Sequence, residues 1–413
     1  MSPFLATETS GTGMAAIRPR TVLLTGGTGF LGSHLGMRLL SDGHRVLFLA
    51  RGRNRQRPED RVKRLLDWFE LPPEPRRRLE VLKGSLDEPG LGLSERDHRS
   101  VLEKVEETVH CASDTSFAAR KRDQVERTNL QGLSRLLDLL QQSPCRSLHL
   151  ISTAYVAGQS SGPCPEDVHQ PPGFHNVYEE TKFEAERLAR KRCAETGLSL
   201  QVYRPSIVYG DARSGRTLIF NALYYPIRTV HYFQKLYTRD LRDNNGRKAR
   251  AMGVHFQSDG RLHLPLRLSS RDEQGINLIP VDHFVRAFMA IREAGPPEGG
   301  VFHIVNPANT SLERITDYTR RFFGLSGIRL APPEDFRTRP RNGLEVLFDK
   351  HIQAYGPYLQ DTRIFEHART SALLAERGIV CPEFSYDIYA ACMGYALDVD
   401  WGRGLFPEAD TRA

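Results

Sequence analysis

Tyr178 and Lys182 lie four residues apart in the segment 176–184, Asn-Val-Tyr-Glu-Glu-Thr-Lys-Phe-Glu. On a helix this spacing places a phenol and an ammonium group on one face. The reference pKa of a phenol is about 10, and an adjacent cation lowers it by favouring the phenolate. The pair is therefore a candidate for proton transfer, with Lys182 as the cation. An ordinary exposed helix face is the alternative.

A hydroxyl residue, Thr153, ends an apolar segment upstream of this helix. At the end of a strand, its hydroxyl is placed to donate a hydrogen bond to a substrate carbonyl oxygen. Ser152 is the rival, but alternation along a strand sends the two side chains to opposite faces, so only one of them should reach the site. A strand-end cap is the alternative role for Thr153.

A glycine-rich motif, Thr-Gly-Gly-Thr-Gly-Phe-Leu-Gly, occupies residues 25–32 between a predicted strand and a predicted helix. Glycines at positions 26, 29 and 32 permit a tight turn and let the backbone approach a pyrophosphate, while the helix offers its N-terminal amides. The motif predicts dinucleotide binding. The residues assigned to the cofactor here are Gly26, Thr28, Gly29, Phe30, Leu31 and Gly32.

The end of the second predicted strand selects the nicotinamide cofactor, because NAD binding uses an acidic residue there and a 2′-phosphate requires cations. The segment reads Leu-Ala-Arg-Gly-Arg-Asn-Arg over residues 49–55, and no carboxylate follows until Glu59. Arg51 at the strand tip favours NADPH, with NADH as the alternative. Arg53 and Arg55 fit a solvated basic loop better than Arg51 does.

Strands alternate with helices from residue 21 to about residue 210, which predicts an α/β fold with a Rossmann-type, doubly wound parallel sheet. The alternation fails after Gly210 and returns over residues 276–306, so a smaller, mostly helical substrate domain should be interleaved with the first. The expected division is a flexible tail (1–20), an NADP-binding domain (21–215, completed by about 276–310) and a substrate-binding domain (216–275 and 311–413).

Composition narrows the classes of protein further. The formal net charge is +7, a mild excess that suits acidic carrier proteins or phosphorylated cofactors but shows no concentrated nucleic-acid motif. The six cysteines lack the spacing of a zinc site, which predicts no metal and a reduced, cytoplasmic setting. No apolar run is long enough for a transmembrane helix. The aromatic segment 224–233 predicts domain core, an acyl or aromatic pocket, or a lid in peripheral contact with a membrane.

Taken together, these motifs resemble the extended short-chain dehydrogenase/reductase family over most of residues 21–310. Within it, the chain looks most like the fatty acyl-CoA reductase and thioester reductase branch, whose NAD-binding domain is male-sterility-like. The segments that carry the likeness, besides those above, are Asn-Leu-Gln-Gly (129–132), Arg-Pro-Ser-Ile-Val-Tyr-Gly (204–210), Leu-Gly-Leu-Ser (91–94), Ser-Thr-Ala-Tyr-Val (152–156), Pro-Val-Asp (280–282) and Tyr-Gly-Pro-Tyr (355–358).

The resemblance implies that Tyr178 protonates the oxygen of a carbonyl that receives hydride, that Lys182 also holds the cofactor ribose, and that Thr153 orients the carbonyl. It further implies cofactor contacts at Ala112 and Pro205 and a structural or proton-relay role for Asn129. Two segments depart from the family pattern on the adenine side. They are Gly-Ser-Leu (84–86) and His-Cys-Ala-Ser (110–113).

Three functions remain open from the sequence. The first is NADPH-dependent reduction of an acyl-CoA or carrier-protein thioester to an aldehyde or alcohol. The second is reduction or epimerisation of a lipophilic ring-containing metabolite, a sterol or a nucleotide sugar. The third is a catalytically inactive NADP-binding regulator, although such proteins usually lose the tyrosine or the lysine. Oligomeric state is left open.

Overall fold

A computed structural model describes residues 18–53, 55–270, 275–295, 300–359, 361–403 and 405. Most of the tail expected over residues 1–20 therefore lies outside the described residues. Its last part is anchored, because Arg18 pairs with Glu106 at 3.0 Å and Arg20 pairs with Glu107.

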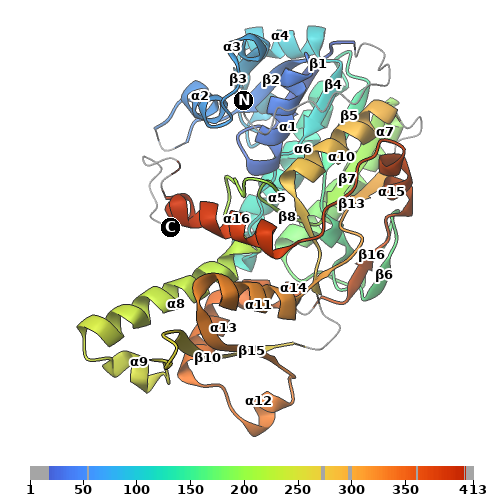
Figure 1. The fold of residues 1–413 in the computed structure, drawn as a ribbon. Coiled ribbons are helices and arrows are strands. Elements are labelled where there is room, and N and C mark those ends of the chain that lie inside the picture. Colours follow the sequence, from blue (N-terminus) through green and yellow to red (C-terminus); the bar gives the residue numbers. More distant parts are fainter. Residues whose placement is uncertain are drawn as a thin grey trace.

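A seven-stranded parallel sheet forms the upper part of the molecule (Figure 1), in the order β13-β7-β5-β4-β1-β2-β3. This confirms the predicted doubly wound α/β fold. Its strands are short and almost wholly buried, as expected for a sheet covered on both faces. Their bounds are β1 (Thr21–Thr25), β2 (Arg45–Ala50), β3 (Leu79–Lys83), β4 (Glu107–His110), β5 (Ser147–Ile151), β7 (Ser199–Pro205) and β13 (Gly300–Ile304).

Helices cover both faces of this sheet and bury two separate apolar clusters against it. One layer holds α1 (Phe30–Ser41), α2 (Pro58–Trp68), α10 (Val281–Ala294) and α15 (Ala368–Ala375). The opposite layer holds α4 (Glu95–Lys104), α6 (Gly132–Leu140) and α7 (Val177–Thr196). Since α15 packs on α10 and β13, the assignment of all of residues 311–413 to the substrate domain is too broad.

The lower part of the molecule in Figure 1 contains the insertion after Gly210 together with residues 311–359. It is built around a three-stranded sheet in the order β15-β10-β9, flanked by helices. The bounds are α8 (Tyr224–Asp243), α9 (Arg247–Ala251), β9 (His255–Phe256), β10 (Leu262–Ser269), α11 (Leu312–Phe323), β15 (Leu325–Ala331), α12 (Asp335–Thr338), α13 (Gly343–Ile352) and α14 (Gly356–Leu359).

One helix, α16 (Tyr386–Asp398), joins the two parts. It packs against α11 below, and the indole Nε1 of Trp68 in the upper part donates to the hydroxyl of Tyr395 at 3.2 Å. The remaining elements are short: α3 (Pro73–Arg76), α5 (Arg122–Glu126), β6 (Gly162–Cys164), β8 (Ile207–Tyr209), β11 (Gly275–Ile276), β12 (Leu278–Pro280), β14 (Thr310–Ser311) and β16 (Arg363–Phe365).

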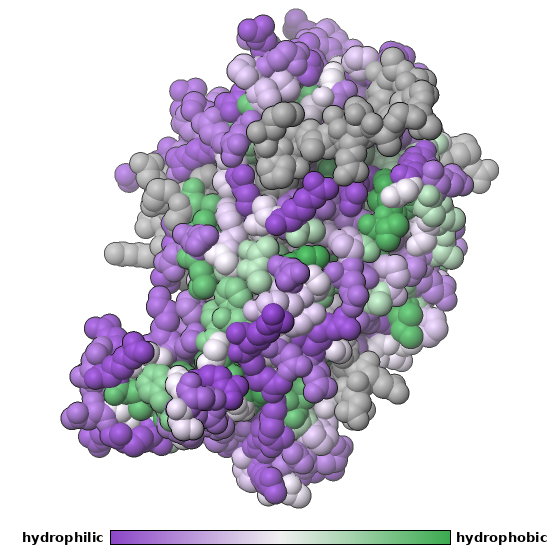
Figure 2. All heavy atoms as spheres, in the orientation of Figure 1, coloured by the Kyte–Doolittle hydropathy of each residue, from purple (hydrophilic) through white to green (hydrophobic). Residues whose placement is uncertain are grey.

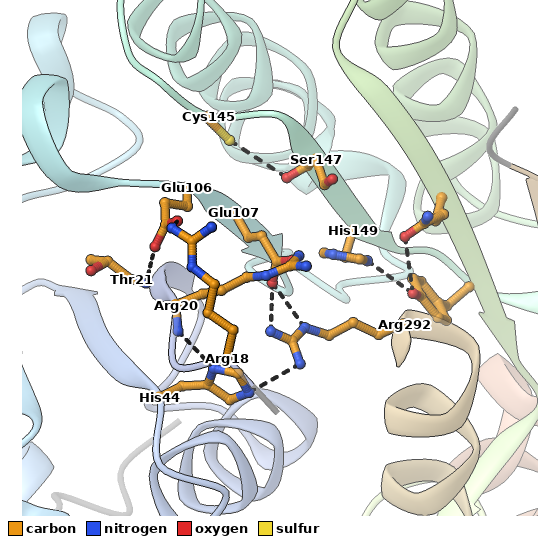
Figure 3. A network of polar contacts seen from close by, with 12 residues as sticks. Arg18, Arg20, Thr21, His44, Glu106, Glu107, Cys145, Ser147, His149 and Arg292 are labelled. Atoms are coloured by element: carbon orange, nitrogen blue, oxygen red, sulfur yellow. Dashed lines mark hydrogen bonds and ion pairs between the residues drawn. The ribbon is translucent and has the colours of Figure 1, made fainter. Parts of the chain in front are cut away.

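A buried polar network ties α10 to the start of β4 (Figure 3). The guanidinium of Arg292 donates to one oxygen of Glu107 at 2.6 Å and 2.9 Å, and it contacts the His44 ring at 3.2 Å. Burial opposes ionisation of Glu107, but the charges of Arg292, His149 and Arg20 and the hydrogen bonds from Arg292 together outweigh it and hold the pKa of that carboxyl below its usual value. The network lies at the edge of the sheet where β1 and β4 begin, opposite the glycine-rich turn that follows β1.

The face of the molecule shown in Figure 2 is mainly hydrophilic, with small apolar patches. Among the described residues, no helix is both long and apolar enough to cross a membrane.

Candidate active site

The glycine-rich turn after β1 packs directly against the end of β4. Gly26 has φ +74°, and a Cβ there would lie 2.5 Å from the backbone nitrogen of Ala112. A Cβ on Gly32 would lie 2.3 Å from the carbonyl oxygen of Gly26. Only glycine meets both restrictions. The turn is closed by the Gly29 amide, which donates to the Gly26 carbonyl at 2.8 Å.

The turn leads straight into α1, whose N-cap residue, Gly29, has no side chain to cap the helix. The first turn of α1 also contains no acidic residue. An uncapped helix N-terminus with a positive dipole end favours an anion. The geometry therefore fits the pyrophosphate of a dinucleotide at residues 26–32.

Arginines from two elements meet beside this turn. Arg61, on α2, donates to the carbonyl of Arg51 at 2.7 Å and to the hydroxyl of Thr28 at 3.0 Å. Burial lowers the pKa of Arg61, and the neighbouring cations of Arg53 and Arg51 lower it further. This repulsion shows that three guanidinium groups lie close together, an arrangement that suits a phosphate.

Arg61 could not be assigned from the sequence, because its contact with Thr28 joins positions far apart in the chain. The only local signal was its place in the basic stretch after the second strand. Arg51, which the sequence did single out, is exposed and pairs with Asp87 at 3.1 Å. Asp87 thus supplies a carboxylate next to Gly-Ser-Leu (84–86), where the acidic residue of the family pattern is missing.

Tyr178 and Lys182 lie in the first two turns of α7. The Asn176 side chain caps this helix by accepting from the Glu179 amide at 3.1 Å. Thr153 follows β5, and its hydroxyl forms a hydrogen bond with the Tyr178 phenol. The Lys182 ammonium donates to the carbonyl of Ile151, at the end of the same strand, at 2.6 Å. The structure therefore brings the three residues together.

At neutral pH the Tyr178 phenol is protonated, and the Lys182 ammonium loses its proton more readily than that of an ordinary lysine. Burial raises the pKa of Tyr178 above its ordinary value, and the hydrogen bond from Thr153 opposes this only in part. Burial also lowers the pKa of Lys182 to about 8. Lys182 is not among the groups that shift the Tyr178 pKa, so the expected lowering by this cation is not met in the structure.

Neighbouring residues hold this group in place. Asn129 lies in a π-helical turn (Arg127–Gln131) and bonds to Ser113, Asp114 and Thr181, which supports a structural role. The Thr153 hydroxyl lies 3.5 Å from the Pro205 carbonyl oxygen. Ser152 differs from Thr153, because its buried hydroxyl makes no hydrogen bond to any described residue.

A largely apolar cavity of about 350 Å³ lies in the lower part of the molecule. Side chains from α8, β10, α11, β15 and α13 line it, among them Ile227, Val230, Ile315 and Phe348. The predicted aromatic segment 224–233 thus forms the first half of α8 and contributes both core and cavity wall. Tyr355 and Tyr358 line the cavity as well.

Phe117 connects this cavity to Tyr178 through stacked or edge-on rings. Its ring centroid lies 6.1 Å from that of Tyr178, 5.9 Å from that of Tyr355 and 5.6 Å from that of Tyr358. Ile207, in β8 just after Pro205, also lines the cavity. One end of the cavity therefore faces the catalytic candidates. Sequence reasoning did not identify Phe117, because nothing in its local pattern marks it.

Comparisons with known proteins give a family and a fold. A profile of the family described as Male sterility protein matches residues 24–288, more than half of the chain. The chain is 30% identical over 216 residues to the polyketide synthase-nonribosomal peptide synthetase pyiS of Pyricularia grisea, a match that covers 50% of this chain and 5% of that protein. The chain therefore corresponds to a small part of the length of such relatives.

Two solved structures share the fold. The terminal R domain from the myxalamid PKS-NRPS biosynthetic pathway superposes with a TM-score of 0.71 at 22% identity, covering 93% of this chain and 92% of that one. A thiolation-reductase di-domain from an archaeal non-ribosomal peptide synthetase gives a TM-score of 0.69 at 18% identity, covering 93% of this chain and 76% of the other.

Proposed function

The chain belongs to the male sterility protein family of NAD-binding domains, and from this membership we propose that it is an NADPH-dependent reductase of acyl thioesters. Its substrate carries an apolar acyl group on a carrier protein or on coenzyme A, and the product is an aldehyde or an alcohol. The observation that carries the proposal is the apolar cavity, whose lining residue Tyr358 contacts Phe117, the ring that also packs against Tyr178.

The residues fit NADPH at every part of the cofactor. Gly26 and Gly32 leave room for the pyrophosphate, and the N-terminus of α1 favours its charge. Arg51 and Arg61 offer guanidinium groups to a 2′-phosphate. Lys182, Ala112 and Pro205 border the place expected for the ribose and nicotinamide. When bound, the cofactor supplies a hydride.

Each residue of the group has a distinct task in thioester reduction. As the carbonyl carbon gains hydride, the Tyr178 phenol gives its proton to the carbonyl oxygen, which Thr153 holds by a hydrogen bond. The resulting hemithioacetal releases the thiol and leaves an aldehyde. The phenolate that remains takes a proton back from solvent, and the Lys182 ammonium, which donates to the Ile151 carbonyl, would hold the cofactor ribose.

Several features support the carrier-bound substrate. One of the similar structures is a thiolation-reductase di-domain, and the relative in Pyricularia grisea is a polyketide synthase-nonribosomal peptide synthetase. The apolar lining of residues 216–275 and 311–359 suits an acyl chain and offers few partners for the sugar and diphosphate of a nucleotide sugar. Substrate binding by these residues is part of the proposal.

The test is NADPH oxidation by the purified chain with octanoyl-coenzyme A, acetyl-coenzyme A and an octanoyl-loaded carrier protein. We expect turnover with both octanoyl donors. Each buried methylene contributes about 0.8 kcal/mol, so kcat/KM should exceed that for the acetyl thioester by at least about tenfold. Octanal or octanol in the product, measured by mass spectrometry, completes the assignment. No NADPH oxidation with any of the three donors would refute the proposal.

A further inference from the structure

The hydroxyl of Tyr358 makes two hydrogen bonds to the start of the helix that carries Tyr178. It donates to Glu179 Oε1 at 2.8 Å and accepts from the Asn176 side-chain amide at 2.7 Å. Tyr358 is 7% exposed, and Glu179 is fully buried. Because buried polar groups are costly to leave unpaired, these bonds fix the relative position of α14 and α7.

The two partners of Tyr358 are the residues that define the beginning of α7. Asn176 caps the helix through the Glu179 amide, and Glu179 in turn accepts from the His175 amide at 2.8 Å. Tyr178 lies between them in the sequence. A shift of Asn176 or Glu179 would therefore move the phenol relative to Thr153.

The buried guanidinium of Arg363 reinforces the contact between Tyr358 and the start of α7. Arg363 lies 3.9 Å from Glu179 Oε1, donates to Asp361 at 2.7 Å and 2.9 Å, and donates to the Gly158 carbonyl at 2.7 Å. Its charge lies 4.7 Å from the centre of the Tyr155 ring. Tyr358 and Arg363 are thus held to the catalytic part of the molecule by buried contacts.

Tyr358 also has a second environment, because its ring lines the apolar cavity and contacts Phe117. The Tyr358 ring therefore lines the cavity that would hold the acyl chain. Its hydroxyl bonds to the residues that begin α7. We propose that Tyr358 is a positioning residue that aligns Tyr178 with a carbonyl whose acyl chain occupies the cavity. This inference rests on the proposed reductase function.

The test compares three variants of the full chain with octanoyl-coenzyme A as the probe. Tyr358→Phe keeps the ring and removes both hydrogen bonds. Asn176→Ser keeps a hydroxyl that caps the helix and removes the amide that donates to Tyr358. Tyr203→Phe is the matched control, because it removes a buried tyrosine hydroxyl that bonds to His149 at 2.9 Å, away from α7.

We expect Tyr358→Phe to lower kcat by at least about tenfold, since small misplacements of reacting groups are costly. The KM for octanoyl-coenzyme A and the Kd for NADPH should stay within about twofold, as binding surfaces are kept. The solvent deuterium isotope effect on kcat should rise, because a misplaced phenol makes proton transfer slower. Asn176→Ser should change kcat and the isotope effect in the same direction and by less.

A general loss of stability would give a different result. It would lower the active fraction, measured by NADPH titration, and would leave the isotope effect at its wild-type value, as expected for Tyr203→Phe. Wild-type kcat and isotope effect in Tyr358→Phe, with an active wild-type enzyme, would overturn the positioning role alone. An inactive wild-type enzyme would instead overturn the proposed function.

Discussion

Burial keeps the Tyr178 proton on the phenol, which is the form that a proton donor needs at neutral pH. The same burial lowers the pKa of Lys182 to about 8, so the amine remains mostly protonated near pH 7. Near pH 7 the Tyr178 phenol therefore carries the proton that it must donate, and the Lys182 side chain is a cation. Thr153 contacts the phenol and supplies the only other hydroxyl of the proposed group.

Replacing Tyr178 by phenylalanine tests this assignment directly. We expect Tyr178→Phe to reduce kcat with octanoyl-coenzyme A by about 10²- to 10⁴-fold, the usual contribution of general acid catalysis. The Kd for NADPH, measured by fluorescence titration, should be unchanged, because the phenol is not needed to bind the cofactor. Unchanged turnover would remove Tyr178 from the mechanism.

Arg61 is the residue with which cofactor choice can be tested. Arg61→Leu should raise the KM for NADPH by about tenfold, as loss of one charge-assisted contact costs about 1.5–3 kcal/mol, and should leave the KM for NADH within about twofold. Lys63→Ala on the same helix is the control, because Lys63 is exposed and pairs only with Asp67 at 2.8 Å. Equal effects on both cofactors would argue against a 2′-phosphate contact.

Residues with local signals could be predicted from the sequence, and residues defined by distant contacts could not. Gly26 and Gly32 follow from the close approach that a turn needs, and Tyr178 and Lys182 follow from helical spacing. Tyr358 is different, since its bond to Glu179 spans positions that only the folded chain brings together. The family resemblance includes its segment, Tyr-Gly-Pro-Tyr (355–358), but no sequence pattern predicts the contact between Tyr358 and Glu179.

At the scale of elements, the ion pair between Glu107 and Arg292 holds α10 against the start of β4. Both elements lie in segments that the sequence assigns to the alternating α/β fold, residues 21–210 for β4 and residues 276–306 for α10. The sequence could not predict that Glu107 and Arg292 meet, since each looks like a solvated charge in its own segment. Buried ion pairs of this kind are recognised only once the helices are packed on the sheet.

Breaking this pair should therefore destabilise the whole domain. Arg292→Met leaves Glu107 buried with Arg20 as its remaining ion-pair partner among the described residues, and we expect a loss of about 3 kcal/mol in the free energy of unfolding. Urea denaturation followed by circular dichroism measures it. Arg18→Ala should cost less than about 1 kcal/mol, because the Arg18 side chain is 81% exposed. Similar losses in both variants would contradict the importance of burial.

The whole molecule combines two parts, of which the upper holds the glycine-rich turn and Tyr178 and the lower holds the cavity. On the proposed function, the cofactor lies in the upper part, the acyl chain lies in the lower part, and the carbonyl lies where they meet. Two connections keep this junction in place: α16 through Trp68 and Tyr395, and α14 through Tyr358. The interleaved chain order was predictable from where the strand-helix alternation failed, but the path of residues 361–375 back to the sheet was not.

Stability of the whole molecule should decrease as the pH falls through about 6.5, the ordinary pKa of histidine. Burial is the main cause that lowers the pKa of eight histidines, His231 and His263 among them. The pKa is about 4 for His34, His44, His149 and His283, and about 3 for His110 and His303. Between pH 6.5 and these values the unfolded chain binds protons that the native protein does not, so acid favours unfolding.

Each such histidine lowers the free energy of unfolding by up to about 1.4 kcal/mol per pH unit in that range. Carboxyl groups act mainly at lower pH, and the raised pKa values of Asp282 and Glu293 oppose the trend there, so pH 6.5 to 5.5 is the informative window. The urea midpoint should fall a little between pH 7.5 and 6.5, where the unfolded imidazoles become about half protonated, and more steeply between pH 6.5 and 5.5. His283→Leu should flatten this dependence by about one proton, and equal midpoints at all three pH values would show that the buried histidines do not control stability.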